Sequence, residues 1–248
     1  MLFPNMLSTL EREPMQALVG ERILTAWEHG IECREPCRAL ALLATALPGS
    51  DAATLASLPL AERNALLMRL RTLTFGASIE GFAVCPECGA QLEFKLNAHD
   101  LEQAQSAPHE ETWFEHGASM KMRPANSNDL AALVDACNEE EARKMLLSRV
   151  MELPELDCAS TESTEWIARF ERMNAPAEIR CTLQCSACGA RPVLDLDIAG
   201  FLWREVAVAA RRLLAEIHTL ARAYGWSEQS IVAMSAKRRS AYLEILEA

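Results

Sequence analysis

The chain contains two copies of the motif Cys-x-x-Cys-Gly-Ala, and they constrain its fold more than any other sequence feature. The first copy holds Cys85 and Cys88, and the second holds Cys185 and Cys188. A Cys-x-x-Cys turn presents two sulfurs as neighbouring ligands, and four thiolates complete the tetrahedral coordination of Zn²⁺. The glycine after each motif allows the backbone to turn with a positive φ. The sequence therefore predicts that the two motifs meet around one structural zinc ion.

Short β-strands are predicted on both sides of each motif, because β-branched and apolar residues are concentrated there. In a zinc ribbon, two such hairpins face each other and each contributes one pair of cysteines. The cysteine pairs of typical ribbons are separated by roughly 15 to 20 residues, whereas almost a hundred residues lie between them here. Loop-closure entropy grows only logarithmically with length, so a split ribbon with a long insertion is predicted. The predicted strands span residues 82–84 and 92–96 around the first motif, and 178–183 and 193–198 around the second.

Two other interpretations of the four cysteines are a redox dithiol and a former ribbon that no longer binds metal. A thioredoxin-type motif follows a strand and opens a helix, whereas each motif here lies between two predicted strands. No His-x-Glu or His-Glu-x-x-His pattern lies near the cysteine motifs, and His109-Glu110-Glu111 does not continue to a second histidine at the required position, which argues against a catalytic zinc ion.

The other five of the nine cysteines are interpreted as buried packing residues, the usual role of free cysteine. Cys33 and Cys37 are four residues apart, but the intervening Pro36 argues against a shared helical face. These five are Cys33, Cys37, Cys137, Cys158 and Cys181.

Helical periodicity dominates the rest of the chain, so we expect an α+β fold that is mainly helical. A split zinc-ribbon-like β unit should carry a helical insertion, and a C-terminal helical tail should follow it. A first helix is expected to begin at Pro14. In chain order, we expect an N-terminal helical segment (1–74), the first zinc knuckle with a β-hairpin (75–125), a helical insertion (126–177), the second zinc knuckle (178–198) and the tail (199–248).

The tail carries a continuous apolar stripe whose members follow one another at intervals of three or four residues. Such a stripe marks one face of a helix that is buried against other elements. Packing in the core is the simpler interpretation, and binding of a partner is the alternative. The stripe comprises Leu202, Val206, Ala209, Leu213, Ile217, Leu220 and Tyr224.

Composition and motifs narrow the functional classes. The 24 basic and 35 acidic residues give a formal net charge of −11, which disfavours a large contact with nucleic-acid phosphates. The longest uncharged apolar run ends at Pro48 and is too short to cross a bilayer. No secretory signal is visible in residues 1–14, so a cytoplasmic protein is expected. Phosphate loops, dinucleotide fingerprints and nucleophile elbows are missing from the sequence, which indicates a non-enzymatic protein without a small-molecule substrate.

The tail also contains four short motifs. They are Phe201–Glu205, a His-x-Leu-Ala pattern at 218–221, Tyr-x-Trp-Ser-Glu at 224–228 and Arg-Arg-x-x-Tyr-Leu at 238–243. In these the chain resembles the baseplate hub and hub-assembly chaperone family of T-even-type contractile-tail phages, with relatives in phage-like contractile injection systems. The likeness is close over the last fifty residues and loose over 60–198. It implies a protein that builds the hub beneath a contractile tail, as a component of the particle or as an assembly chaperone, by contacts with other baseplate proteins.

The tail motifs supply the candidate partner-binding residues. Large aromatic side chains at a helix break either hold two helices together or anchor a partner, and basic side chains beside them are common at protein interfaces. Both interpretations apply to Tyr224, Trp226, Arg238, Arg239 and Tyr242.

A zinc-ribbon protein that binds nucleic acid or acts in transcription is the alternative function. Such ribbons expose basic and aromatic residues near their knuckles. Here the neighbouring side chains are mostly acidic, which favours protein–protein contacts. The acidic residues are Glu80, Glu87, Glu93, Asp195 and Asp197, against the basic residues Lys95, Arg180 and Arg191.

Overall fold

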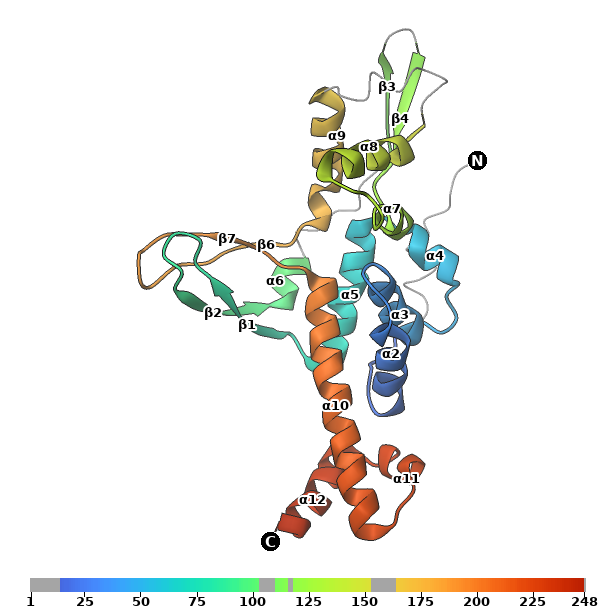
Figure 1. The fold of residues 1–248 in the computed structure, drawn as a ribbon, viewed down its shortest axis with the longest axis vertical. Helices are drawn as coiled ribbons and strands as arrows, with labels where there is room; N and C mark the ends of the chain where they lie inside the picture. Colours follow the sequence, from blue (N-terminus) through green and yellow to red (C-terminus); the bar gives the residue numbers. More distant parts are fainter. Residues whose placement is uncertain (1–13, 103–109, 116–117, 153–163, 248) are drawn as a thin grey trace.

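The long helix α10 (Ile198–Tyr224) organises the molecule, and the other parts are arranged around it (Figure 1). The structure, a computed structural model, describes residues 14–102, 110–115, 118–152 and 164–247. A helical body lies beside the first half of α10, a finger of two β-hairpins extends from its start, and an insertion lobe lies at the far end of the body (Figure 1). The expected fold class, α+β and mainly helical, is confirmed.

The body, as far as the structure describes it, is built from four helices, of which α2, α3 and α5 pack against α10 and α4 packs against α3. Leu42 and Leu67 are fully buried in its core, and the same core continues into the base of the finger. Arg71 donates hydrogen bonds to both carboxylate oxygens of Glu205 at 3.1 and 2.8 Å, which ties the body to α10. The helices are α2 (Glu21–Ile31), α3 (Cys37–Ala46), α4 (Ala52–Ser57) and α5 (Leu60–Phe75).

The apolar stripe of the tail lies on α10 and packs in the core, as the simpler interpretation predicts. Leu202, Val206, Leu213, Ile217 and Leu220 are buried along one face of the helix. Gly225 ends α10 in the left-handed conformation, with φ of 67°. Within the described part of the chain, no helix is long and apolar enough to cross a membrane.

The start of the first helix was predicted wrongly. Residues 14–19 are not helical, and α2 begins only at Glu21. Gly20 has φ of 57°, a left-handed conformation that a continuous right-handed helix does not contain. The short helix α4 lies within the expected helical segment, and Asp51 caps it by accepting a hydrogen bond from the backbone N–H of Thr54 at 3.1 Å.

The insertion lobe combines a small antiparallel sheet with the helices α7, α8 and α9 and has its own core. The sheet has the strand order β3-β4-β5, and Met122, Leu147 and Val150 are buried beneath it. The indole N–H groups of Trp113 and Trp166 both donate to Glu115, at 2.9 and 2.7 Å. The elements are β3 (Glu111–Glu115), β4 (Ala118–Met122), α7 (Ser127–Ala132), α8 (Glu139–Val150), β5 (Met151–Glu152) and α9 (Thr164–Asn174).

A buried carboxylate holds the lobe together at its base. Asp129 is completely buried in α7. It accepts two hydrogen bonds from Arg123, one from Arg149 and one from the backbone N–H of Asn126, at 2.6 to 3.1 Å. Burial disfavours its charge, but the bonds from Arg123 and Asn126 outweigh this and hold the pKa of Asp129 below its ordinary value. The lobe therefore depends on one ionised group that has several partners.

A close contact between Gly30 of α2 and Trp203 of α10 gives a first prediction. A Cβ atom at position 30 would lie 2.3 Å from the indole ring. We therefore expect Gly30→Ala to destabilise the protein by about 1 to 2 kcal/mol, because overpacking exceeds the gain in helix propensity. Chemical denaturation of Gly30→Ala with Trp203 intact, and again with Trp203→Leu, checks this. Equal losses in the two backgrounds would contradict the contact.

Candidate metal centre

The finger consists of two β-hairpins whose turns are the two cysteine motifs (Figure 1). Each hairpin is antiparallel, with Val84 opposite Gln91 in the first and Thr182 opposite Val193 in the second. The first hairpin is preceded by α5, and α6 (Ala98–Glu102) follows it. The strands are β1 (Ser78–Val84) and β2 (Gln91–Asn97), and β6 (Arg180–Thr182) and β7 (Val193–Asp195).

The two turns are built alike, down to their backbone hydrogen bonds. In the first, the N–H of Cys85 donates to Ala90 and the N–H of Gly89 donates to Cys85, both at 2.9 Å. Cys185, Ala190 and Gly189 repeat this pattern at the same distances. Gly89 and Gly189 have φ of 73° and 76°, the left-handed region in which glycine avoids the strain of a side chain.

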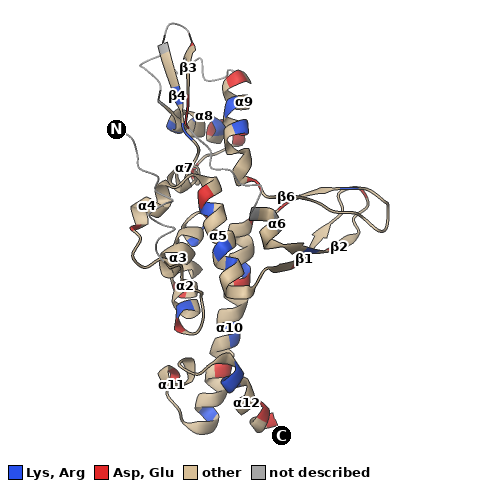
Figure 2. Ribbon diagram, turned by 180° about the vertical axis from the view of Figure 1, so that it is seen from behind, with Lys and Arg blue, Asp and Glu red and all other residues tan. Residues whose placement is uncertain are grey.

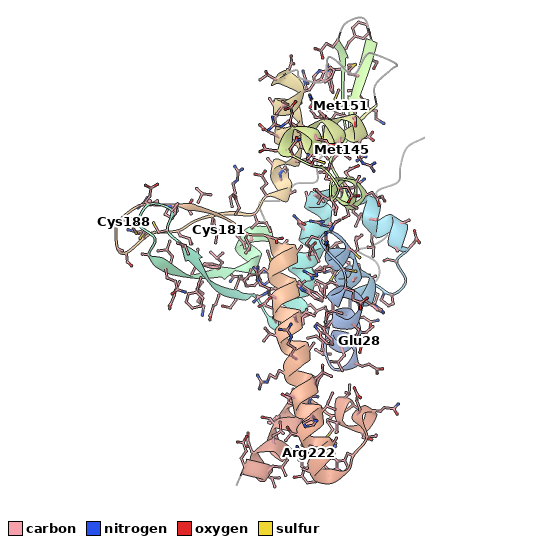
Figure 3. All side chains as sticks on the ribbon, in the orientation of Figure 1. Glu28, Met145, Met151, Cys181, Cys188 and Arg222 are labelled. Atoms are coloured by element: carbon pink, nitrogen blue, oxygen red, sulfur yellow. The ribbon has the colours of Figure 1, made fainter. Side chains whose placement is uncertain are left out.

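The four sulfurs converge at the tip of the finger, where Figure 3 labels Cys188. The Sγ atoms of Cys85 and Cys188 are 3.8 Å apart, and those of Cys88 and Cys185 are 3.6 Å apart. All four lie within 4.8 Å of one another. Four thiolates around a tetrahedral zinc ion have sulfurs about 3.7 Å apart. The predicted meeting of the two motifs is confirmed, and the cluster has the dimensions of a tetrathiolate metal site.

The surroundings of the Cys185 sulfur suit a metal-bound thiolate, whereas desolvation and hydrogen bonds with the neighbouring thiols raise the pKa of Cys88 and Cys188. Cys85 and Cys185 are buried with Leu92 in a small apolar cluster, whereas Cys88 and Cys188 are exposed. The backbone N–H of Cys188, together with that of Ala187, hydrogen-bonds to the Cys185 sulfur and lowers the pKa of this thiol to about 7. Backbone amides that point at the sulfurs also orient the ligands of metal sites.

The aromatic residues predicted to bind a partner contact one another between the end of α10 and α12 (Ala236–Glu247). Tyr224 stacks on Trp226 with ring centroids 4.5 Å apart, and Tyr242 meets both rings edge-on. The Arg238 guanidinium lies 5.9 Å from the centre of the Tyr242 ring and is exposed. The rings thus connect two helices, and all three remain half-buried.

Arg239 has different surroundings from Arg238. Its side chain is buried, and it donates to Glu216 of α10 at 2.8 Å and to the carbonyl of Met234 at 2.6 Å. The bond to Glu216 attaches α12 to α10. The exposed part of the candidate partner surface is therefore Arg238 with the accessible edges of Tyr224, Trp226 and Tyr242.

Of the other cysteines that the structure describes, Cys181 alone is buried. The prediction that they are buried packing residues holds for that residue and not for the rest. Cys37 and Cys137 are exposed, and Cys33 is half-buried. Cys33 and Cys37 do not share a helical face, as the intervening Pro36 indicated, but their sulfurs lie 2.6 Å apart. The Cys-x-x-x-Cys spacing was the available signal, and the turn between α2 and α3 brings the two residues together. Cys158 lies outside the described residues.

A family model described as T4 bacteriophage base plate protein matches residues 41–203. The matched segment includes both cysteine motifs, the insertion lobe and the start of α10. Neither a curated protein nor a solved structure matches the chain. The resemblance seen in the sequence was close over the last fifty residues and loose over 60–198, so the match falls mostly on the part where the likeness was loose.

Proposed function

The chain belongs to the family of T4 bacteriophage base plate proteins, and from this we propose that it is a non-enzymatic component or assembly chaperone of the hub of a contractile-tail baseplate. The proposal includes baseplates of phage-like contractile injection systems. The observation that carries it is the family match over most of the chain. The protein acts through contacts with other baseplate and hub proteins, made in the host cytoplasm and, for a component, kept in the particle.

We further propose that Cys85, Cys88, Cys185 and Cys188 hold one structural zinc ion. The support is the sulfur separations of 3.6 and 3.8 Å and the matching backbone turns. Thiolate sulfur is a preferred ligand of zinc. A site of four thiolates leaves no open position for water or substrate, which supports a structural role rather than a catalytic one.

The charges of the finger favour a protein partner over nucleic acid. Lys95 pairs with Glu80 at 2.7 Å, and Arg180 lies beside both Glu178 and Asp195. Acidic and basic residues are interspersed in the ribbon view (Figure 2). Nucleic-acid binding rests on clustered basic residues, so paired charges of this kind weaken the alternative function.

Exposed apolar side chains give the finger a surface suited to protein contacts. Phe82 and Val84 are 64% and 70% exposed on β1, two residues apart and therefore on one face of the strand. Val193 is similarly exposed on β7. These side chains make the finger one candidate contact surface for a baseplate partner, and Arg238 with the tail aromatics makes a separate one near the other end of α10 (Figure 1).

Co-purification from cells that produce the complete tail tests the proposed function. The tagged chain is expected to bring down sheath, tube or spike proteins, identified by mass spectrometry. Recovery of RNA polymerase subunits instead, together with salt-sensitive binding of DNA or RNA in a filter assay, would overturn the proposal in favour of a transcription-associated ribbon.

Arg238 and Arg239 provide a matched pair of variants for the tail surface. Arg238→Ala removes an exposed side chain and should change the free energy of unfolding by less than about 0.5 kcal/mol while reducing recovery of the partners. Arg239→Ala breaks the buried bond to Glu216 and should destabilise the packing of α12 on α10. Undiminished recovery with Arg238→Ala would exclude this part of the surface from the interface.

A further inference from the structure

A second pair of cysteines lies outside the finger, at the turn between α2 and α3. Cys33 follows the end of α2, and Cys37 is the first residue of α3. We propose that Cys33 and Cys37 form a reversible disulfide, which makes this turn a site of oxidation by small-molecule disulfides. The inference rests on these two residues and does not depend on the proposed function or on the metal.

The sulfurs are already placed for bond formation. The Sγ atoms of Cys33 and Cys37 are 2.6 Å apart, about half an ångström more than the S–S bond of a disulfide. The Cys33 sulfur also lies 3.2 Å from the carbonyl oxygen of His29. Forming the bond therefore needs only a small movement of either side chain.

The flanking helices hold this arrangement, so it is a property of the folded state. Helices α2 and α3 pack against each other, and both pack against α10. Arg38 of α3 donates to the carbonyl of Gly30 in α2 at 3.2 Å, and this bond joins the two sides of the turn. The Arg38 guanidinium also lies over the ring of Trp203. In an unfolded chain, closing the same loop costs conformational entropy.

Both thiols can meet a reagent from solution. Cys37 is exposed and Cys33 is half-buried. The hydrogen bond with Cys33 raises the pKa of the Cys37 thiol to about 11, so this thiol is mostly protonated at neutral pH. Reaction is expected to be faster at pH 8 than at pH 7, because the thiolate is the nucleophile.

The chemistry is a two-step thiol–disulfide exchange with a small-molecule disulfide such as oxidised glutathione. One cysteine thiolate attacks a sulfur of the reagent, forms a mixed disulfide and releases one glutathione thiolate. The second cysteine thiolate then attacks the protein sulfur of the mixed disulfide and releases the other glutathione. The two protein thiols lose two electrons, the reagent gains them, and the two protons end on the released thiols.

Peptide mapping of the full-length protein tests the proposal. The native protein is equilibrated with oxidised and reduced glutathione, quenched in acid, alkylated and digested with trypsin. Trypsin cleaves after Arg34, between the two cysteines, so a disulfide joins peptide 23–34 to peptide 35–38. We expect this joined pair to predominate in the native protein, with an equilibrium constant at least about tenfold higher than in urea.

The outcomes distinguish a disulfide that the fold favours from the ordinary reaction of an exposed thiol with glutathione. Cys37→Ser should give glutathione attached to Cys33 and no joined peptides, and a reductant should restore two alkylated peptides in the wild-type chain. Exposed Cys137 serves as the control thiol. Separate alkylated peptides from the oxidised native protein, or equal joining in the native and urea-unfolded chains, would overturn the proposal.

Discussion

The Cys88→Ser variant is expected to lose its metal and to loosen both hairpins of the finger together. Structural zinc contributes on the order of 10 kcal/mol of folding free energy. The two knuckles bury only the small cluster of Cys85, Leu92 and Cys185 between them, so little else joins their tips. Limited proteolysis should therefore cut near both motifs in the variant, although only one of them carries the substitution.

The rest of the molecule supplies the controls for this result. The buried face of helix α10 packs against other helices and not against the finger tip. The circular dichroism of the variant should therefore retain most of its helical signal. Cys137→Ser removes an exposed thiol from outside the finger and should leave the protease pattern and metal content unchanged. A wild-type protease pattern in Cys88→Ser would contradict the shared site.

Asp129→Asn is expected to destabilise the insertion lobe by about 2 to 3 kcal/mol. Removing one partner of a buried ion pair leaves the other charge uncompensated. The loss is moderated here because Arg123 and Arg149 are 30% and 41% exposed. Chemical denaturation, or hydrogen exchange of the lobe, measures the change. Glu139→Gln, which removes an exposed pair with Arg143, should change stability by less than about 0.5 kcal/mol.

The effect of Asp129 should also depend on pH. Its pKa is lowered by folding, so the stabilisation is fully present above the unfolded value of about 4 and is lost as the pH falls through the lower folded value. The difference in unfolding free energy between the wild type and Asp129→Asn should be constant from about pH 5 to 7 and shrink below about pH 4. A difference that grows with acidity would contradict this.

Local patterns in the sequence were sufficient to predict the finger and the long helix. The motifs at Cys85 and Cys185 predicted two hairpins that meet, because tetrahedral coordination requires all four sulfurs together. The stripe from Leu202 to Tyr224 predicted a buried helical face, because a period of 3.6 residues aligns these side chains. Both inferences depend on residues that are close in sequence or of unusual chemistry.

The features that were missed depend on contacts between distant segments or on single backbone angles. Asp129 reads as an ordinary polar residue near a helix start, and its burial results from Arg123 and Arg149 on other elements. Gly20 fixes where α2 begins through its positive φ, which periodicity does not reveal. Arg239 resembled an exposed interface residue until the fold placed Glu216 beside it. The sulfurs of Cys33 and Cys37 meet through the packing of two helices.

The metal content of the purified protein tests the central claim most directly. The full-length chain, purified without chelators and analysed by inductively coupled plasma mass spectrometry, is predicted to contain one zinc ion per chain. Peptide mapping should show that Cys85, Cys88, Cys185 and Cys188 resist alkylation until a chelator removes the metal. A folded protein that contains no zinc, with all four finger thiols freely alkylated, would contradict the account.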